Sequence, residues 1–174
     1  MKKIFFIAIA LIISVQSFAQ HNGLKGLNVG VGVPFECYDL KAAGADLHIG
    51  FDRAYPISDQ FALGFYLSGG GGVLGAFHPY NEYDRVYSMI KLSAGLMMEI
   101  GDLDDKPFLL GVSPCLGVGL LDMDLVLPIE IRFGRVLNNW YVMGELTYGC
   151  SLAHETVGFE PCIRVGYNFG KKKK

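Results

Sequence analysis

Ten ionisable residues could do chemistry in this sequence, because each stands inside a stretch that is otherwise apolar or rich in glycine. They are Asp46, His48, Asp52, Lys91, Glu99, Glu130, Arg132, Glu145, Glu160 and Arg164. A charge removed from water is costly unless it is paired, so we expect a buried network of ion pairs. Six acids stand against three bases in this set, which indicates that some carboxylates are protonated, bind a cation or lie in wet zones. A proton or ion path is the alternative interpretation.

Catalysis has one weak candidate. His154 and Glu155, with Ser151 nearby, combine an imidazole, a carboxylate and a hydroxyl in one polar segment. Such triplets arise by chance in any polar loop, so we assign no catalytic residue, no cofactor and no metal site, and we expect a protein that is not an enzyme. The glycine run at 69–72 lacks the Lys-Ser/Thr pair and the helix of a phosphate-binding loop.

The elements that must position the ten residues show strict alternation of apolar and small or polar residues. In residues 43–52, Ala, Leu, Ile and Phe occupy the odd positions, while Gly, Asp and His occupy the even ones. A period of two over this length predicts a β-strand with two different environments. The pattern recurs in eight segments: 25–33, 43–52, 60–68, 86–100, 108–118, 127–134, 140–149 and 159–169.

Eight such strands predict an antiparallel up-and-down β-barrel, either soluble or in a membrane. A soluble barrel must wet its outer face, whereas the less apolar face here is mostly Gly, Ala and Ser with scattered charges. That face suits the narrow lumen of an eight-stranded barrel, which its own side chains fill. The continuous apolar face suits lipid, where a closed barrel is the only β-structure that pairs every backbone group. We therefore predict an all-β transmembrane barrel with the ten ionisable residues facing its lumen.

Aromatic residues support the same prediction by gathering at strand ends, as in the girdles of outer-membrane barrels. One predicted girdle consists of Phe51, Phe61, Phe108, Phe133, Trp140, Tyr167 and Phe169. Residues 54–59, 101–106 and the tight Asn138-Asn139 turn are expected on the periplasmic side. The longer outer connections are expected at 34–41, 69–85, 119–126 and 150–158.

The first residues have the pattern of a secretory signal peptide. Lys2 and Lys3 precede an apolar run that is too short to span a bilayer as a helix, and Ser17-Phe18-Ala19 offers a cleavage site before Gln20. We expect a signal peptide at 1–19, a barrel at 20–170 and a basic tail at 171–174. Removal of 1–19 takes away two lysines and no acid, which shifts the formal charge from −2 to −4. A mildly acidic chain argues against a nucleic-acid partner.

Four cysteines in an exported chain are compatible with disulfides in three connectivities. Cys37 and Cys150 lie at the outer ends of predicted strands, while Cys115 and Cys162 fall on the lumen face. Zinc is the weaker option, because there is no CxxC spacing.

The chain resembles the small outer-membrane β-barrels of the OmpA/OmpX type, also called porin-family or outer membrane protein beta-barrel domain proteins. The resemblance rests on the signal ending Ser17–Gln20, the eight alternating segments and the closing segment Ile163–Phe169. It implies an integral outer-membrane protein surrounded by lipid, whose last strand is read by the barrel-assembly machinery. Members usually end on an aromatic residue, whereas Gly170 and Lys171–Lys174 follow Phe169 here.

Two kinds of function follow from this resemblance. The favoured one is a structural or surface-interaction barrel with a filled lumen, whose loop partner the sequence does not identify. The alternative is a narrow porin-like channel for small solutes, and a lipid-modifying outer-membrane enzyme is less favoured.

Overall fold

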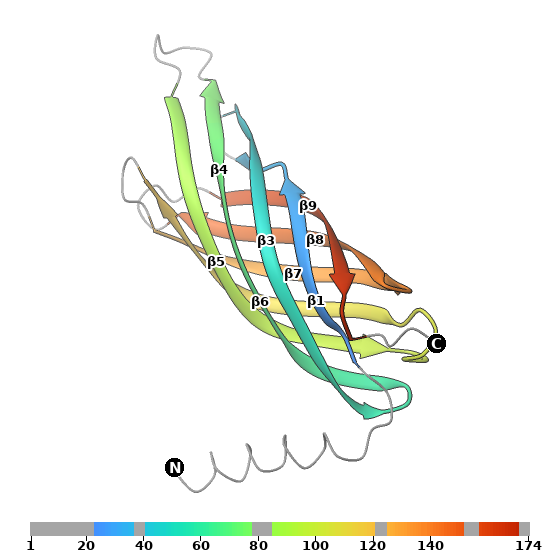
Figure 1. The fold of residues 1–174 in the computed structure, drawn as a ribbon. Helices are drawn as coiled ribbons and strands as arrows, with labels where there is room; N and C mark the ends of the chain where they lie inside the picture. The colour runs from blue at the N-terminus through green and yellow to red at the C-terminus, as the bar shows by residue number, and fades with distance from the viewer. Residues whose placement is uncertain (1–22, 37–40, 78–84, 121–124, 152–156, 171–174) are drawn as a thin grey trace, which may run out of the picture.

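The structure is a computed structural model that describes residues 23–36, 41–77, 85–120, 125–151 and 157–170. These residues form nine strands and no helix (Figure 1). The strands are β1 (Lys25–Gly32), β2 (Phe35–Glu36), β3 (Lys41–Ser58), β4 (Phe61–Phe77), β5 (Arg85–Ile100), β6 (Phe108–Gly119), β7 (Leu125–Leu137), β8 (Trp140–Ser151) and β9 (Val157–Asn168). No helix in these ranges is long and apolar enough to cross a membrane.

The strands close into an antiparallel barrel with eight strand positions. β1 and β2 together occupy one strand position, because each pairs with β3 on one side and with β9 on the other. The short gap between them contains Pro34, which has no backbone N–H to donate. Backbone bonds continue across the gap, since the Val33 amide donates to the Pro161 carbonyl at 3.0 Å and the Gly44 amide donates to the Pro34 carbonyl at 3.2 Å. The predicted eight-stranded barrel is confirmed.

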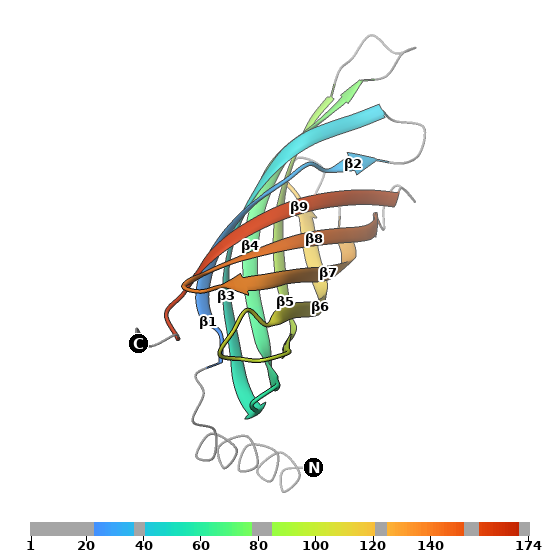
Figure 2. The ribbon, with the colours of Figure 1, turned by 90° about the vertical axis from the view of Figure 1, so that its right-hand side faces the viewer.

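The two ends of the barrel differ. At the turn end, Asp59–Gln60, 101–107 and Asn138–Asn139 join the strands, and Asn138 has the positive φ of 58° that a tight hairpin needs. The two ends of the described chain also meet there, where the Phe169 amide donates to the Lys25 carbonyl at 2.6 Å. The opposite end, where β3 begins and β4 ends, is called the loop end. β3, β4 and β5 reach farther at this end than β6 to β9 (Figures 1 and 2).

Two predicted connections were wrong, because the β3–β4 hairpin is longer than expected. Ala54–Ser58 continues β3, and the turn is reduced to Asp59–Gln60. The glycine run at 69–72, expected to begin an outer loop, lies in β4 and pairs with both β3 and β5. Pairing on both sides supplies the backbone hydrogen bonds of the run, which overrides the low strand propensity of glycine.

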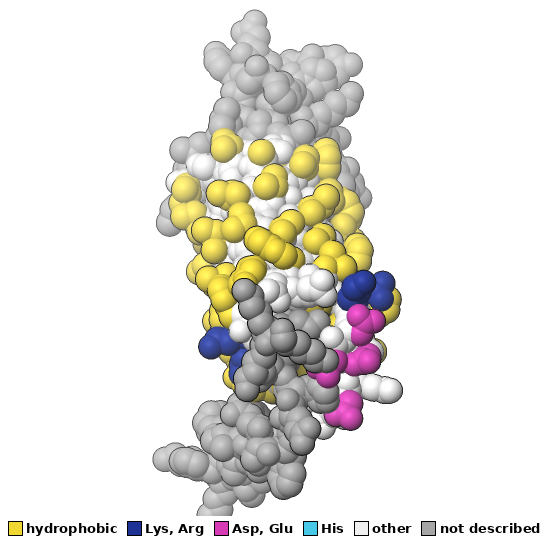
Figure 3. All heavy atoms as spheres, turned by 45° about the vertical axis from the view of Figure 1, so that its right-hand side comes forward, with side chains coloured by type: hydrophobic (Ala, Val, Ile, Leu, Met, Phe, Trp, Pro, Cys, Tyr) yellow, Lys and Arg dark blue, Asp and Glu magenta, His cyan; other side chains and the backbone are white. Residues whose placement is uncertain are grey.

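The two faces of the wall lie as the alternation predicts. On β5, Leu92 is 60% exposed while its neighbours Lys91 and Ser93 are buried. Hydrophobic side chains cover much of the visible outer surface in a broad band (Figure 3). The interior is filled instead by buried polar groups and a few large side chains, including Tyr66, Met97, Tyr141 and Met143.

Most of the predicted aromatic girdle lies at or near the turn end. Phe61, Phe108 and Trp140 begin their strands, Phe133 lies in the last part of β7, and Phe169 directly follows β9. Tyr167 joins two of them, with ring centroids 5.1 Å from both Trp140 and Phe169. Phe51 was placed wrongly at a strand end, because β3 continues to Ser58. Its ring contacts Phe65 within the wall, at 6.3 Å between centroids.

The outward face predicts how an added charge acts at different depths. We expect Leu92→Arg, within β5, to cost about 2–4 kcal/mol of folding free energy in a bilayer, and Ile100→Arg, at the turn end of the same strand and face, about 0–1 kcal/mol. Reversible unfolding in lipid vesicles, followed by gel migration of unheated samples, measures both. Equal losses for the two variants would contradict a lipid-facing wall.

Candidate functional site

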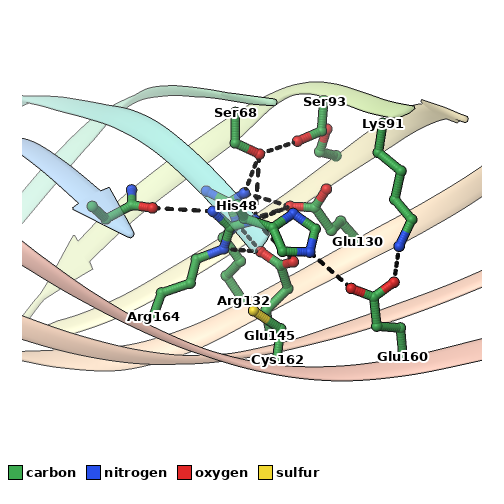
Figure 4. A network of polar contacts seen from close by, with 12 residues as sticks. His48, Ser68, Lys91, Ser93, Glu130, Arg132, Glu145, Glu160, Cys162 and Arg164 are labelled. Atoms are coloured by element: carbon green, nitrogen blue, oxygen red, sulfur yellow. Dashed lines mark hydrogen bonds and ion pairs between the residues drawn. The ribbon is translucent and has the colours of Figure 1, made fainter. Parts of the chain in front are cut away.

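The strand alternation brings the ten predicted ionisable residues onto the inner face of the barrel. They come from β3, β5, β7, β8 and β9, and each is at most 6% exposed. Nine of them fall into two groups. The central group surrounds Arg132 and Arg164, and a second group surrounds Lys91 (Figure 4).

The central group is organised by one carboxylate between two guanidinium groups. Glu145 Oε2 accepts hydrogen bonds from Arg132 Nε at 2.7 Å and from Arg164 Nε at 2.5 Å. Glu145 Oε1 accepts a further bond from Arg164 Nη2 at 3.0 Å. Glu130 Oε1 takes two bonds from Arg132, at 2.5 Å from Nη2 and 2.9 Å from Nε. Charge-assisted bonds of this kind are among the strongest side-chain interactions.

Asp52 anchors this group on the side of β3. Its Oδ2 accepts hydrogen bonds from the Tyr141 hydroxyl at 2.5 Å and from Asn28 Nδ2 at 2.6 Å. Its Oδ1 lies 3.5 Å from Arg132 Nη1, an ion pair without a hydrogen bond. The Arg132 guanidinium also stacks over the Tyr66 ring, 3.6 Å from the ring centroid. Arg132, on β7, therefore links its own strand to β3, β4 and β8.

Four uncharged residues complete the central group. The ten residues predicted from the sequence did not include them, because that set contains only acidic and basic side chains and His48. Ser68 Oγ accepts hydrogen bonds from Arg132 Nη2 at 2.7 Å and from Arg164 Nη2 at 3.4 Å, and it bonds to Ser93 Oγ at 2.6 Å. Asn28 Oδ1 accepts from Arg164 Nη1 at 3.0 Å, and Tyr141 is bonded to Asp52. All four have the inward parity of their strands, which is the signal that could have identified them.

The second group lies closer to the loop end. The Lys91 ammonium lies between two carboxylates, 2.5 Å from Asp46 Oδ2 and in an ion pair with Glu160. His48 Nε2 contacts Glu160 Oε1 at 2.8 Å and lies 3.7 Å from Asp46 Oδ2. The tenth residue, Glu99, lies near the turn end, where its Oε2 accepts a hydrogen bond from the Leu24 amide at 2.9 Å.

Glycines on neighbouring strands make room for the large inward side chains. Tyr141 is paired in register with Gly166, His48 with Gly70, and Arg164 with Gly30. A Cβ added at these glycines would lie 2.0 Å from Tyr141 Cζ, 2.6 Å from His48 Nδ1 and 2.6 Å from Arg164 Cγ. The long side chains thus lie flat against bare backbone, which explains the high glycine content of the lumen face.

The remaining sequence candidates contribute little to this site. Cys115 and Cys162 are buried with free thiols, so no disulfide joins them. Cys37 lies outside the described residues, as do His154 and Glu155 of the proposed catalytic triplet, and the side chain of Cys150 is not described.

Comparisons with known proteins establish the fold and nothing finer. No family model matches the sequence, and no curated protein matches it. Solved structures of small outer-membrane proteins do match. The attachment invasion locus protein Ail of Yersinia pestis is 13% identical, with a TM-score of 0.52 over 85% of this chain and 99% of that chain.

Two further structures match in the same way. Neisserial surface protein A (NspA) is 12% identical, with a TM-score of 0.53 over 83% of this chain and 97% of that chain. The outer-membrane enzyme PagL is 11% identical, with a TM-score of 0.53 over 82% of this chain and 99% of that chain. The chain therefore has the fold of small eight-stranded outer-membrane barrels, as the resemblance to the OmpA/OmpX type implied.

The central group predicts a large difference between two arginines of β7. Arg132→Met should lower the free energy of unfolding by about 3–5 kcal/mol, because it leaves buried carboxylates without their partner. The exposed Arg135→Met, three residues along the strand, removes a hydrogen bond to the Lys106 carbonyl and a contact with the Phe108 ring, and should cost no more than about 1 kcal/mol. Urea unfolding of both variants in the same vesicles provides the measurement, and adding Glu130→Gln to Arg132→Met should recover part of the loss. Similar effects of the two arginines would refute a network centred on Arg132.

The seating of side chains on glycine gives a matched test within β9. Gly166→Ala should destabilise the barrel by about 1–3 kcal/mol through overpacking against Tyr141. Gly158→Ala should be neutral or slightly stabilising, because among the described residues its added Cβ would meet only the Phe35 carbonyl oxygen at 3.8 Å. Thermal transitions of heat-modifiable gel migration compare the two, and a larger loss at Gly158 would show that the interior is packed differently.

Proposed function

We propose that this protein is an integral outer-membrane barrel of the structural or surface-interaction type, which presents its loop end to partners outside the cell. One observation carries the proposal: the middle of the lumen is occupied by a crosslinked network rather than by a water path. Arg132 and Arg164 are both 0% exposed and are bonded to the same carboxylate of Glu145. A barrel of eight strands has little interior beyond its own side chains.

Location and orientation in the membrane belong to the same proposal. The apolar band and the fold shared with Ail, NspA and PagL support the outer membrane as the site. The sequence pattern of residues 1–19, which lie outside the described residues, supports export through a cleaved signal peptide. The even number of strand positions puts both ends of the described chain at the turn end, which we assign to the periplasm. The last strand, which closes the barrel against β1, is the segment that we expect the assembly machinery to read.

Two of the similar structures favour a surface role over chemistry. Ail is described as an attachment invasion locus protein and was also solved with a heparin analogue, and NspA is described as a surface protein. PagL is an enzyme of the same fold and similar identity, so the fold alone does not decide the matter. In the described part of this chain, each charged residue of the two groups is bonded to or ion-paired with another, which favours a structural network over a substrate site.

Conductance across planar bilayers tests the plugged lumen. We expect the unmodified protein to show no steady channel, because the bonds among Arg132, Arg164 and Glu145 block the path. Replacing both arginines by alanine should open a leak in whatever fraction still folds, judged by heat-modifiable migration of the same sample. A large, stable conductance from the unmodified protein would favour the porin-like alternative.

Tag accessibility in the same experiment series tests the orientation. A peptide tag inserted at Asn81 should be labelled on intact cells, whereas a tag after Lys174 should be labelled only after the outer membrane is opened. The reverse labelling would place the loop end in the periplasm and remove the surface role.

A further inference from the structure

The Lys91 group contains a set of metal-ligand atoms that the network does not fully use. One ligand atom each from Asp46, His48 and Glu160 lie within 4.8 Å of one another, and all three residues are buried. Zinc bonds to nitrogen and oxygen are about 2.1 Å long, so a tetrahedral site holds its ligand atoms roughly 3.4 Å apart. Movements of about an ångström would therefore bring the three ligand atoms around one ion, with the fourth position left for water.

Asp46 provides a second, independent observation. Its side chain is only 2% exposed, yet its Oδ1 has no hydrogen-bond partner among the described residues. Buried polar atoms of this kind are nearly always satisfied, and a carboxylate oxygen is satisfied well by a cation. The free oxygen belongs to the same residue whose Oδ2 already binds the Lys91 ammonium.

The charge balance of the lumen also favours an additional cation. The buried ionisable residues comprise six carboxylates against Lys91 and two arginines, with His48 able to be neutral. Within the Lys91 group, two carboxylates share one ammonium. A divalent ion at this position would offset the excess carboxylate of the Lys91 group.

Lys91 must move away from the two carboxylates to make way for such an ion. Its two cross-strand partners, Gly70 and Gly117, have no side chains, but His48 lies over Gly70 and the Met89 sulfur lies near Gly117. Gly158, the next inward position beyond Glu160 toward the loop end, is less crowded, because among the described residues a Cβ added there would meet the Phe35 carbonyl oxygen at an ordinary contact distance of 3.8 Å. The side of Gly158 is therefore the direction in which the Lys91 ammonium meets the least packing when it leaves the two carboxylates.

We propose that Asp46, His48 and Glu160 form a binding site for a divalent transition-metal ion of the zinc class, which competes with the Lys91 ammonium for the two carboxylates. One imidazole and two carboxylates are a donor set that suits this class of ion. A second cluster, of His48, Glu145 and Cys162, is also compact. It is the poorer site, because Glu145 would have to leave two guanidinium groups, whereas Asp46 and Glu160 share one ammonium.

Calorimetric titration of Zn²⁺ into the folded full-length protein, purified in detergent without a histidine tag, tests the site. We expect one ion per chain for the unmodified protein. Lys91→Met should tighten binding about tenfold or more by removing the competing ammonium. His48→Gln and Asp46→Asn should each weaken zinc binding by roughly 10- to 100-fold or more. Loss of a residue that only supports a ligand already costs that much, and these two residues would bind the ion directly.

Matched controls separate the site from other ligands in the chain. His154→Gln and Cys162→Ser should leave the affinity within about twofold of the unmodified value, and heat-modifiable migration shows that each variant is folded. Because bound metal stabilises only the folded state, Zn²⁺ should also raise the transition temperature of the unmodified protein and not that of His48→Gln. Absence of binding to both the unmodified protein and Lys91→Met would overturn the proposal, as would unchanged binding in His48→Gln. Channel conductance plays no part in these measurements, so they fail or succeed independently of the proposed function.

Discussion

The interior of this barrel depends on one carboxylate, that of Glu145, held between the guanidinium groups of Arg132 and Arg164. Each arginine then reaches other strands: Arg132 binds Glu130 and Ser68, and Arg164 binds Asn28. A barrel that exposes its apolar face to lipid has no hydrophobic core of ordinary size to hold its strands together. Buried ion pairs are weak evidence for stability when apolar packing could replace them, but here they occupy the place of the core, and losing one member leaves the others unpaired.

Much of the fold could be predicted from the sequence, because a period of two reports directly on a wall with two environments. The inward position of all ten ionisable residues follows from parity alone. The errors arose where local propensity conflicted with pairing between strands. Gly69–Gly72 reads locally as a loop, and Pro56 with Ser58 reads as a turn, yet each continues a strand because its neighbours supply the hydrogen bonds.

The detailed contacts of the site were less accessible to sequence reasoning. Parity says that Asp52 and Tyr141 face the lumen, but not that they touch, since they lie on strands far apart in the chain and meet across the interior. Such contacts depend on the stagger of the strands around the barrel, which no single strand encodes. For the same reason, the division of the charges into a central group and a Lys91 group emerges only from the closed structure.

The packing of large inward side chains against glycines also affects which register neighbouring strands adopt. A slip of one residue between β8 and β9 would turn one strand inside out, which lipid forbids. A slip of two residues keeps both faces correct, and the apolar pattern cannot detect it. Such a slip would set Tyr141 opposite Arg164 or Asn168 in place of Gly166, so two bulky groups would compete for one space. The order of large and small inward residues therefore favours one register between neighbouring strands. Because register stagger sets strand tilt and barrel diameter, the same order selects one barrel geometry.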